Sequence, residues 1–260
     1  PAPAPAPPAA PHTATPALDA FADAEPAQGV PPKFWDQRYR LFSRFDRGVL
    51  MDDESWYSVT PEAISRHVAR RCRGLTCLDC FGGAGGSAIA LARECAAVVM
   101  GELDAARASR AAFNAGLYGV RGRLDVLAVD ALHLLVPPRR FDVVHLSPPW
   151  GGMGYSEREE FELAEIRVGG ADGVELLRRA LQAANSAVYL LPRNVSADGT
   201  RRGLEAAGAG GVPAVLESVF LHHKLKMKVL YVGEAVCGAA ARKQKQRQQR
   251  AKVGGSTGVY

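Results

Sequence analysis

The sequence predicts an α/β fold built on a doubly wound, mostly parallel sheet with an antiparallel edge strand and a small N-terminal helical extension. Three observations carry this prediction. Strand-like apolar runs alternate with helical patterns from residue 75 onward, as in parallel βαβ units. A glycine-rich turn follows the first of these runs. The last two strand-like runs have no helix between them, so we expect them to pair antiparallel.

The segment before this alternating pattern has two helix signals. Side chains at helical spacing predict one amphipathic helix over 33–45 that docks on the main domain. They are Phe34, Arg38, Leu41, Phe42 and Phe45. Thr60 and Pro61 predict a second helix that reaches about Arg71, with Thr60 as its N-cap and Pro61 at its first position.

The alternating elements follow from residue 75. Strands are expected over 75–80, 96–101, 123–129, 141–146, 187–191, 214–220 and 226–232. Helices are expected over 87–94, 104–117, 172–184 and 200–207. Asp172 and Glu175 have the spacing of a capping box, and a polar turn at 222–224 joins the last two strands.

Composition divides the chain into four parts. Residues 1–32 are rich in Pro and Ala and are expected to be disordered. A helical extension over 33–72 and the main domain over 73–237 follow, and a basic tail over 238–260 is also expected to be disordered. Six Lys and Arg residues lie between 242 and 252, and their charge is slightly larger than the net charge of +5 for the whole chain. The rest of the chain is therefore nearly neutral. The tail is expected to attract nucleic acid or to act as a linker or nuclear import signal.

Cysteine usage and hydropathy indicate the cellular compartment that the chain suits. The five cysteines are irregularly spaced and lie mostly in apolar segments, which favours a reducing compartment. Cys77 and Cys80 have a C-x-x-C spacing, but core packing explains them better than zinc, and no metal site is expected. No apolar run of membrane-spanning length is present, and the chain's start lacks the pattern of a signal peptide. Neither membrane insertion nor secretion is expected.

The glycine turn after the first strand predicts a cofactor site. Gly82, Gly83 and Gly85 allow the backbone to approach a ligand at a helix N-terminus. Gly83-x-Gly85-x-x-Ala88 with a downstream Glu102 also satisfies the dinucleotide fingerprint, so a nicotinamide-dependent oxidoreductase is one alternative.

Acidic residues at three successive strand ends favour a different cofactor. Asp79 would repel a pyrophosphate but suits a cationic amino or sulfonium group. Glu102 is placed for ribose hydroxyls and Asp130 for an adenine amino group. Together they indicate S-adenosylmethionine, and the structural alternative is that the three acids cap neighbouring helices.

A rigid aromatic edge follows the fourth strand. Ser147-Pro148-Pro149-Trp150 suits holding a planar base against an indole, although a proline-rich turn capping the core is the alternative. The Ser147 hydroxyl and the Pro148 carbonyl could accept the N–H groups of an exocyclic amine. In-line methyl transfer needs positioning more than a strong base, and the six histidines are given no role.

The chain resembles the trimethylguanosine synthases, which methylate RNA caps at guanine N2. The resemblance covers 33–232 and includes the segments 33–46, 56–62, 79–86, 146–152 and 191–194. It implies the Rossmann fold of class I methyltransferases and a role for Trp150 in stacking on 7-methylguanine. Three departures are Glu102 for a usual Asp, Ser87 for a common Asn and Gly82 for a common Cys.

The resemblance also implies further site residues. Lys33, Tyr155, Arg193 and Asn194 would meet the cap phosphates, and Phe45, Ser58 and Thr60 would close over the cofactor.

The wider biology implied is trimethylation of 7-methylguanosine caps on snRNA and snoRNA by a monomer. It also implies ribonucleoprotein core proteins as partners and a place in the nucleus, nucleolar or Cajal-body-like, and in the cytoplasm. Alternatives are an N2-guanine or N6-adenine methyltransferase acting on rRNA or tRNA, and a catalytically silent RNA-binding scaffold.

Overall fold

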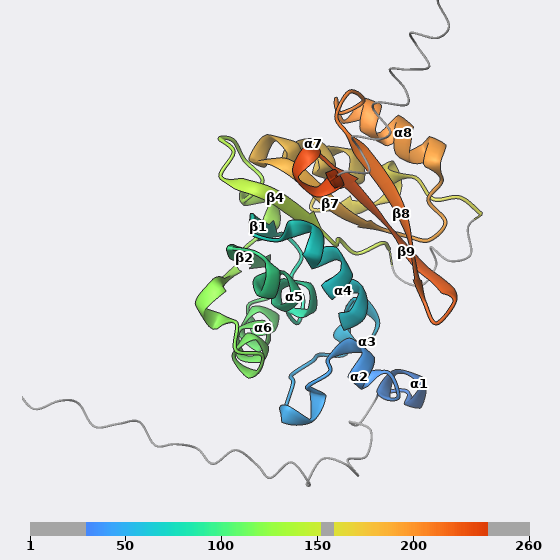
Figure 1. Ribbon diagram of the computed structural model, residues 1–260. Helices are drawn as coiled ribbons and strands as arrows, with labels where there is room; N and C mark the ends of the chain where they lie inside the picture. The colour runs from blue at the N-terminus through green and yellow to red at the C-terminus, as the bar shows by residue number, and fades with distance from the viewer. Residues whose placement is uncertain (1–29, 152–158, 239–260) are drawn as a thin grey trace, which may run out of the picture.

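The main sheet confirms the predicted architecture (Figure 1). The computed structural model describes residues 30–151 and 159–238, and within these the sheet has seven strands in the order β3-β2-β1-β4-β7-β9-β8. They are β1 Thr76–Asp79, β2 Ala97–Glu102, β3 Leu124–Ala128, β4 Phe141–Leu146, β7 Ala184–Leu191, β8 Ala214–Leu221 and β9 Lys224–Val232. The first five run parallel, and β9 pairs antiparallel with β7 and β8.

Helices cover both faces of the sheet. On one face lie α4 (Glu62–Ala69), α5 (Gly86–Glu94) and α6 (Ala105–Leu117), and on the other α7 (Gly173–Ala183) and α8 (Ala197–Ala206) (Figure 1). The shorter elements are α1 Pro32–Trp35, α2 Arg38–Leu41, α3 Ser55–Ser58, the 3-10 helices Phe45–Arg47, Arg70–Cys72, Arg121–Arg123, Ala131–His133 and Leu163–Glu165, and a ladder of β5 Arg167–Val168 with β6 Ala171–Asp172.

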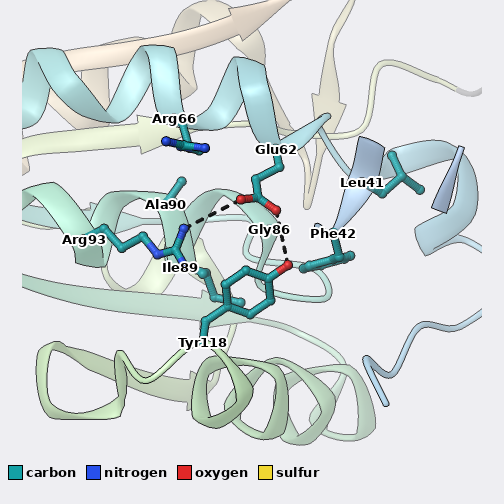
Figure 2. Close-up of a pocket in the computed structure, with 9 residues that line it drawn as sticks. All are labelled: Leu41, Phe42, Glu62, Arg66, Gly86, Ile89, Ala90, Arg93 and Tyr118. Atoms are coloured by element: carbon teal, nitrogen blue, oxygen red, sulfur yellow. Dashed lines mark hydrogen bonds and ion pairs between the residues drawn. The ribbon is translucent and has the colours of Figure 1, made fainter. Parts of the chain in front are cut away.

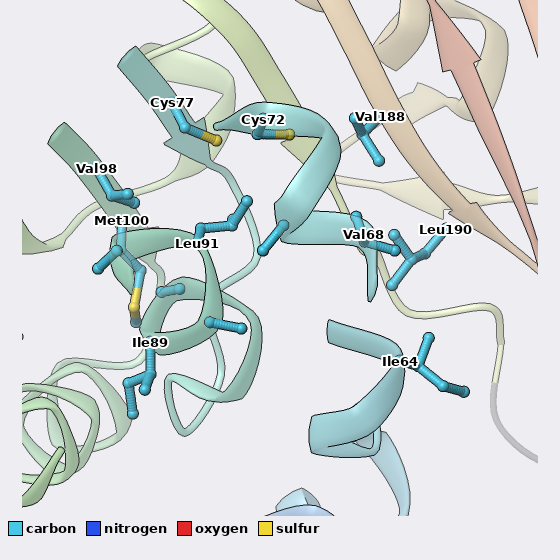
Figure 3. Packing of buried hydrophobic residues seen from close by; sticks show 14 of the residues in the cluster. Ile64, Val68, Cys72, Cys77, Ile89, Leu91, Val98, Met100, Val188 and Leu190 are labelled. Atoms are coloured by element: carbon cyan, nitrogen blue, oxygen red, sulfur yellow. The ribbon is translucent and has the colours of Figure 1, made fainter. Parts of the chain in front are cut away.

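Successive strand residues feed two hydrophobic layers. In β1, Cys77 joins the layer under α4 and α5, whereas Leu78 joins the layer under α7. Figure 3 shows the first layer, where Val68 from α4, Leu91 from α5 and Val188 from β7 gather around the sheet. All five cysteines are free and buried. Burial raises the pKa of the Cys80 thiol and the Asp79 charge raises it further, which keeps the thiol protonated. The C-x-x-C pair therefore packs the core.

The single helix predicted over 33–45 is wrong. The segment forms α1, α2 and a 3-10 turn from Phe45 to Arg47. The reason lies in tertiary hydrogen bonds that take the backbone N–H groups away from a helix. The Ser43 N–H donates to the Glu62 carboxylate at 2.7 Å, and the Arg44 N–H donates to the Tyr118 hydroxyl at 3.1 Å. The segment still docks on the main domain, as expected.

The predicted helix start at Thr60 is also shifted. Pro61 has a non-helical backbone (φ −49, ψ 134), so Pro61 is the N-cap and α4 begins at Glu62. The N-cap position of α4 has no side-chain cap hydrogen bond. The helix ends at Ala69 and continues as the 3-10 turn to Cys72.

Two further local predictions need correction. Asp172 caps α7 through the Glu175 N–H, but the Glu175 carboxylate binds Arg178 and Arg179 instead of closing a capping box. The turn between β8 and β9 contains only His222 and His223, both with positive φ. Lys224 is already part of β9.

A buried amide is among the contacts that fasten the N-terminal extension to the main domain. Asn114 of α6 is 0% exposed. Its side chain accepts from the Leu50 N–H at 2.8 Å and donates to the Leu50 carbonyl at 2.8 Å and to the Ala84 carbonyl at 2.9 Å. Leu50 belongs to the extension and Ala84 to the glycine turn. One side chain therefore couples these two segments.

Two features are absent from the described residues. No helix in them combines the length and apolar character needed to cross a membrane. They also hold no group of three or more His, Cys, Asp or Glu side chains arranged for a metal ion. The four-part division of the chain stays a prediction, and its terminal segments lie almost wholly outside the described ranges.

Replacing Asn114 with Ala should destabilise the fold by about 3 kcal/mol, because three backbone groups lose their buried partner. Urea denaturation measures the change. The same substitution at Asn185, an exposed residue of β7, is the matched control and should change stability by less than about 0.5 kcal/mol. Equal effects at the two positions would contradict the role given to Asn114.

Candidate functional site

The glycine turn joins β1 to α5 at the carboxyl edge of the sheet. Gly83 (φ 55) and Gly85 (φ 91) have left-handed backbones that favour glycine. Gly82 is required for a different reason, since a Cβ there would lie 2.2 Å from the Met100 side chain. Met100 is fully buried, so the chain has filled with methionine the space that a side chain at 82 would occupy.

Asp79 ends β1 and is 0% exposed. Its Oδ1 lies 2.9 Å from Nδ1 of His145, the residue opposite it in β4. Its Oδ2 is buried and has no hydrogen-bond partner within the described residues. A buried carboxylate oxygen without a donor is costly, so this atom suits a cationic or N–H-bearing ligand group.

His145 is a site residue that sequence reasoning missed. It is 1% exposed and pairs with Asp79 inside the sheet. The available signal was a single imidazole within the apolar run 141–146, because a buried polar group needs a partner. The identity of the partner depends on the register of β1 against β4, which the sequence does not give.

Glu102 ends β2 and holds the glycine turn in place. Its Oε2 accepts from the Gly83 N–H at 2.9 Å, and its Oε1 accepts from the Asp104 N–H at 3.0 Å. The structure therefore joins Glu102 to the predicted cofactor turn. Asp130 lies two residues beyond β3, and its carboxylate accepts from the Leu132 N–H at 2.9 Å. For Asp130, the alternative of a helix cap describes the contact observed.

The Ser-Pro-Pro-Trp edge meets the glycine turn directly. The Ser147 hydroxyl donates to the Phe81 carbonyl at 3.2 Å, and Pro148 beside it is buried. This contact bridges the ends of β1 and β4. It leaves the lone pairs of the Ser147 oxygen able to accept further hydrogen bonds.

Trp150 is half-buried and packs against both hydrophobic layers. Its indole N–H donates to the Leu190 carbonyl of β7 at 3.2 Å, which fixes the ring. The predicted phosphate contact Tyr155 lies outside the described residues. Among the other predicted phosphate contacts, Arg193 is exposed just after β7, and the Asn194 carbonyl accepts from the Phe161 N–H at 3.2 Å.

The predicted site residues of the extension differ in how close they lie to the glycine turn. The Thr60 carbonyl and the Val59 side chain lie against Gly86, at the start of α5. Phe45 instead packs with Trp35 and Trp56, at centroid distances of 5.5 and 5.7 Å.

The other two predicted extension residues have local contacts. The Ser58 hydroxyl donates to the Glu54 carbonyl of its own helical turn. Lys33 in α1 lies 4.9 Å from the Phe34 ring. Of the four extension residues, Thr60 is the one whose carbonyl is placed near Gly86, at the start of α5.

A small cavity lies in the seam between extension and domain (Figure 2). It is lined by Phe42, Gly86 and Tyr118 among others, and Glu62 is bound there by Arg93 at 3.6 Å and by the Tyr118 hydroxyl at 3.2 Å. Its volume of about 10 Å³ holds at most one water. The cavity is therefore a packing gap and is separate from the candidate site formed by Asp79 and Glu102.

Arg107 of α6 links the extension to the site acids. It binds Asp52 at 2.8 Å and Glu54 at 2.7 Å, and it lies 3.7 Å from Glu102. Burial alone would raise the pKa of the Asp52 carboxyl. Hydrogen bonds from Ser55 and Arg107 outweigh burial and hold that pKa below its usual 3.8.

The fold and this edge define the class of the protein. A glycine turn, acids ending β1 and β2 and a Ser-Pro-Pro edge after β4 give the chain the architecture of the class I methyltransferase fold. A crystal structure of a Porphyromonas gingivalis W83 protein assigned as a methyltransferase agrees in fold, with a TM-score of 0.59 and 16% identity over 84% of this chain and 56% of that one.

Sequence comparison gives the family. The family described as RNA cap guanine-N2 methyltransferase matches residues 75–236. Trimethylguanosine synthase of Schizosaccharomyces pombe is 34% identical over 171 residues, which is 62% of this chain and 70% of that protein. The Saccharomyces cerevisiae protein of the same name is 31% identical over 172 residues, 62% of this chain and 54% of its own. The chain belongs to the RNA cap guanine-N2 methyltransferase family, which confirms the resemblance.

Low pH should weaken the contact between Asp52 and Arg107. Because the pKa of Asp52 is lower in the folded than in the unfolded state, its stabilising contribution is complete above 3.8 and is lost as pH falls through the folded value. The unfolding free energy of the native sequence should therefore fall more steeply below about pH 4 than that of Asp52→Asn. Urea titrations across this range measure both slopes. Asp53→Asn, an exposed neighbour, should follow the native curve; parallel curves for all three would refute the assignment.

Proposed function

We propose that this chain transfers a methyl group from S-adenosylmethionine to the exocyclic N2 of 7-methylguanosine in RNA caps. The observation that carries the proposal is the hydrogen bond between Ser147 and Phe81. It sets the base-holding edge against the turn that would hold the cofactor, so that donor and acceptor groups share one end of the sheet. Membership of the cap guanine-N2 methyltransferase family supports the choice of substrate.

The residues at the strand ends fit S-adenosylmethionine. The unpartnered, buried Oδ2 of Asp79 would accept from the cationic amino group. Glu102 would meet the ribose hydroxyls, and Asp130 would lie near the adenine. The glycines of the turn would allow close backbone approach. When bound, the sulfonium supplies an electrophilic methyl group.

Trp150 would hold the base. Methylation at N7 makes guanine cationic, and tryptophan is the strongest aromatic partner for a cation. Stacking would favour the 7-methylated base over plain guanine by about 1–2 kcal/mol. The hydrogen bond to Leu190 keeps the indole from swinging away, so its face is already set before the base arrives.

Ser147 and Pro148 would orient the amine. The N2 lone pair is delocalised into the ring, so accepting hydrogen bonds from its N–H groups turns that lone pair toward the methyl. Transfer would form the carbon–nitrogen bond as the sulfur–carbon bond breaks, and the amine would then lose one proton to solvent. Positioning supplies most of the rate, and no strong base is needed.

The finer proposals concern product and setting. The names of the two yeast relatives support 2,2,7-trimethylguanosine as the product. We further propose snRNA and snoRNA as substrates, ribonucleoprotein core proteins as partners, a monomeric enzyme, and a nuclear location that includes nucleolar or Cajal-body-like sites.

Trp150→Ala should lower kcat/KM on a 7-methylguanosine cap dinucleotide by about tenfold or more and abolish the preference over the unmethylated cap. Methyl transfer followed by product mass measures both. Trp150→Phe should recover part of the preference, and Phe113→Ala, an exposed aromatic of α6, should leave it intact. Equal rates on capped and uncapped guanosine, or rRNA or tRNA transfer that cap analogues fail to inhibit, would overturn the proposal.

Asp79→Asn should weaken binding of S-adenosylmethionine at least tenfold but leave 5′-methylthioadenosine unchanged, because that analogue lacks the amino-acid end. Calorimetry compares the two ligands, with exposed Asp125→Asn as the control. A chain that binds neither ligand would be a silent scaffold. Thermal stabilisation by a nicotinamide dinucleotide alone would instead favour the oxidoreductase.

A further inference from the structure

The β8–β9 hairpin overhangs the site edge of the sheet. The last pair between β7 and β9 is Leu191 with Lys228, yet β9 begins at Lys224. Residues 224–227 therefore extend roughly 13 Å past the end of β7. Because β7 is parallel to β4, this overhang lies at the same edge as Ser147 and Trp150. Figure 1 shows the hairpin projecting beyond the sheet.

The overhang is positively charged and has an exposed aromatic ring. Lys224 and Lys226 are exposed, and Phe220 is 60% exposed. The sequence from Ser218 to Lys228 contains no acidic residue. Within the described part of the chain, no carboxylate forms an ion pair with either lysine. Buried Met227 holds the strand to the core, so the lysines are presented on a supported strand.

Acids on the neighbouring elements are already engaged. Glu217 of β8 binds His67 and Arg71. Glu160 and Glu162 both lie within ion-pair distance of Arg202. The positive charge of the overhang is therefore open to an outside anion.

The overhang continues the predicted phosphate-binding segment. The Lys228 ammonium donates to the Val195 carbonyl at 2.5 Å, one residue after Asn194 and two after Arg193. Positive side chains thus follow one another from Arg193 to Lys228 and out along the overhang. A nucleic-acid backbone leaving the cap phosphates would meet them in turn.

We propose that this overhang, together with residues 219–223 of the same hairpin, binds the RNA chain that follows the capped nucleotide. Lys224 and Lys226 would contact phosphates, and Phe220 would stack on an unpaired base. Basic side chains and an exposed aromatic ring in one hairpin are features that bind single-stranded nucleic acid. A register shift between Val219 and Phe220 supports this, since such irregularities redirect side chains near binding sites. The proposal rests on the proposed cap-methylating function.

The test compares a cap dinucleotide with a capped RNA of about 20 nucleotides. The double variant Lys224→Gln/Lys226→Gln should raise KM for the capped RNA five- to tenfold and leave kcat and KM for the dinucleotide unchanged. The salt dependence of RNA binding should fall by roughly 1.4 in log–log slope for two lost phosphate contacts. Phe220→Ser should weaken RNA binding severalfold without changing the salt slope.

The matched control is Arg121→Gln/Arg123→Gln, which removes two exposed charges at the start of β3, the opposite edge of the sheet. It should leave the RNA parameters unchanged. The proposal is overturned if this control matches the lysine variant, if the dinucleotide is affected equally, or if RNA binding by the lysine variant is unchanged. Anisotropy with uncapped RNA separates the two proposals, because it reports overhang binding even if no methyl transfer occurs.

Discussion

The glycine turn after β1 is held by side chains from three separate elements, and the arrangement of the site follows from this. Ser147 binds the carbonyl of Phe81, Glu102 binds the N–H of Gly83, and Asn114 binds the carbonyl of Ala84. Each contact reaches a different residue of a turn whose left-handed glycines would otherwise leave it conformationally free. The acceptor edge, the end of β2 and the extension are therefore positioned relative to one another through one short stretch of backbone.

Much of the fold could be predicted because burial leaves a strong pattern in α/β sequences. The parallel strands are mostly apolar and the helices between them are amphipathic, so the order of strands and helices can be predicted from the sequence. The extension could not be predicted in the same way. Its aromatic spacing suits a helix, but Glu62 and Tyr118 take the N–H groups of Ser43 and Arg44. Such competition depends on residues that are distant in sequence and close only after folding.

The candidate site shows the same division. Asp79 and Glu102 were expected at one edge because parallel strands end together, and the structure puts both there. The partner of Asp79 was not foreseeable, because strand register decides that His145 lies opposite. Asp130 forms a local cap, so the sequence pattern alone could not separate a ligand-facing acid from a structural one.

The anchoring of Trp150 to Leu190 makes substrate discrimination a property of the interior. The indole is wedged between the two apolar layers and tied to a strand backbone, so its tilt is inherited from how β7 is packed. A core substitution beneath β7 that adds or removes one side-chain methyl group would tilt the indole plane, although the substituted residue does not contact RNA. Substitutions at such buried positions are thus a route by which relatives can change their base preference while every residue that contacts the base stays the same.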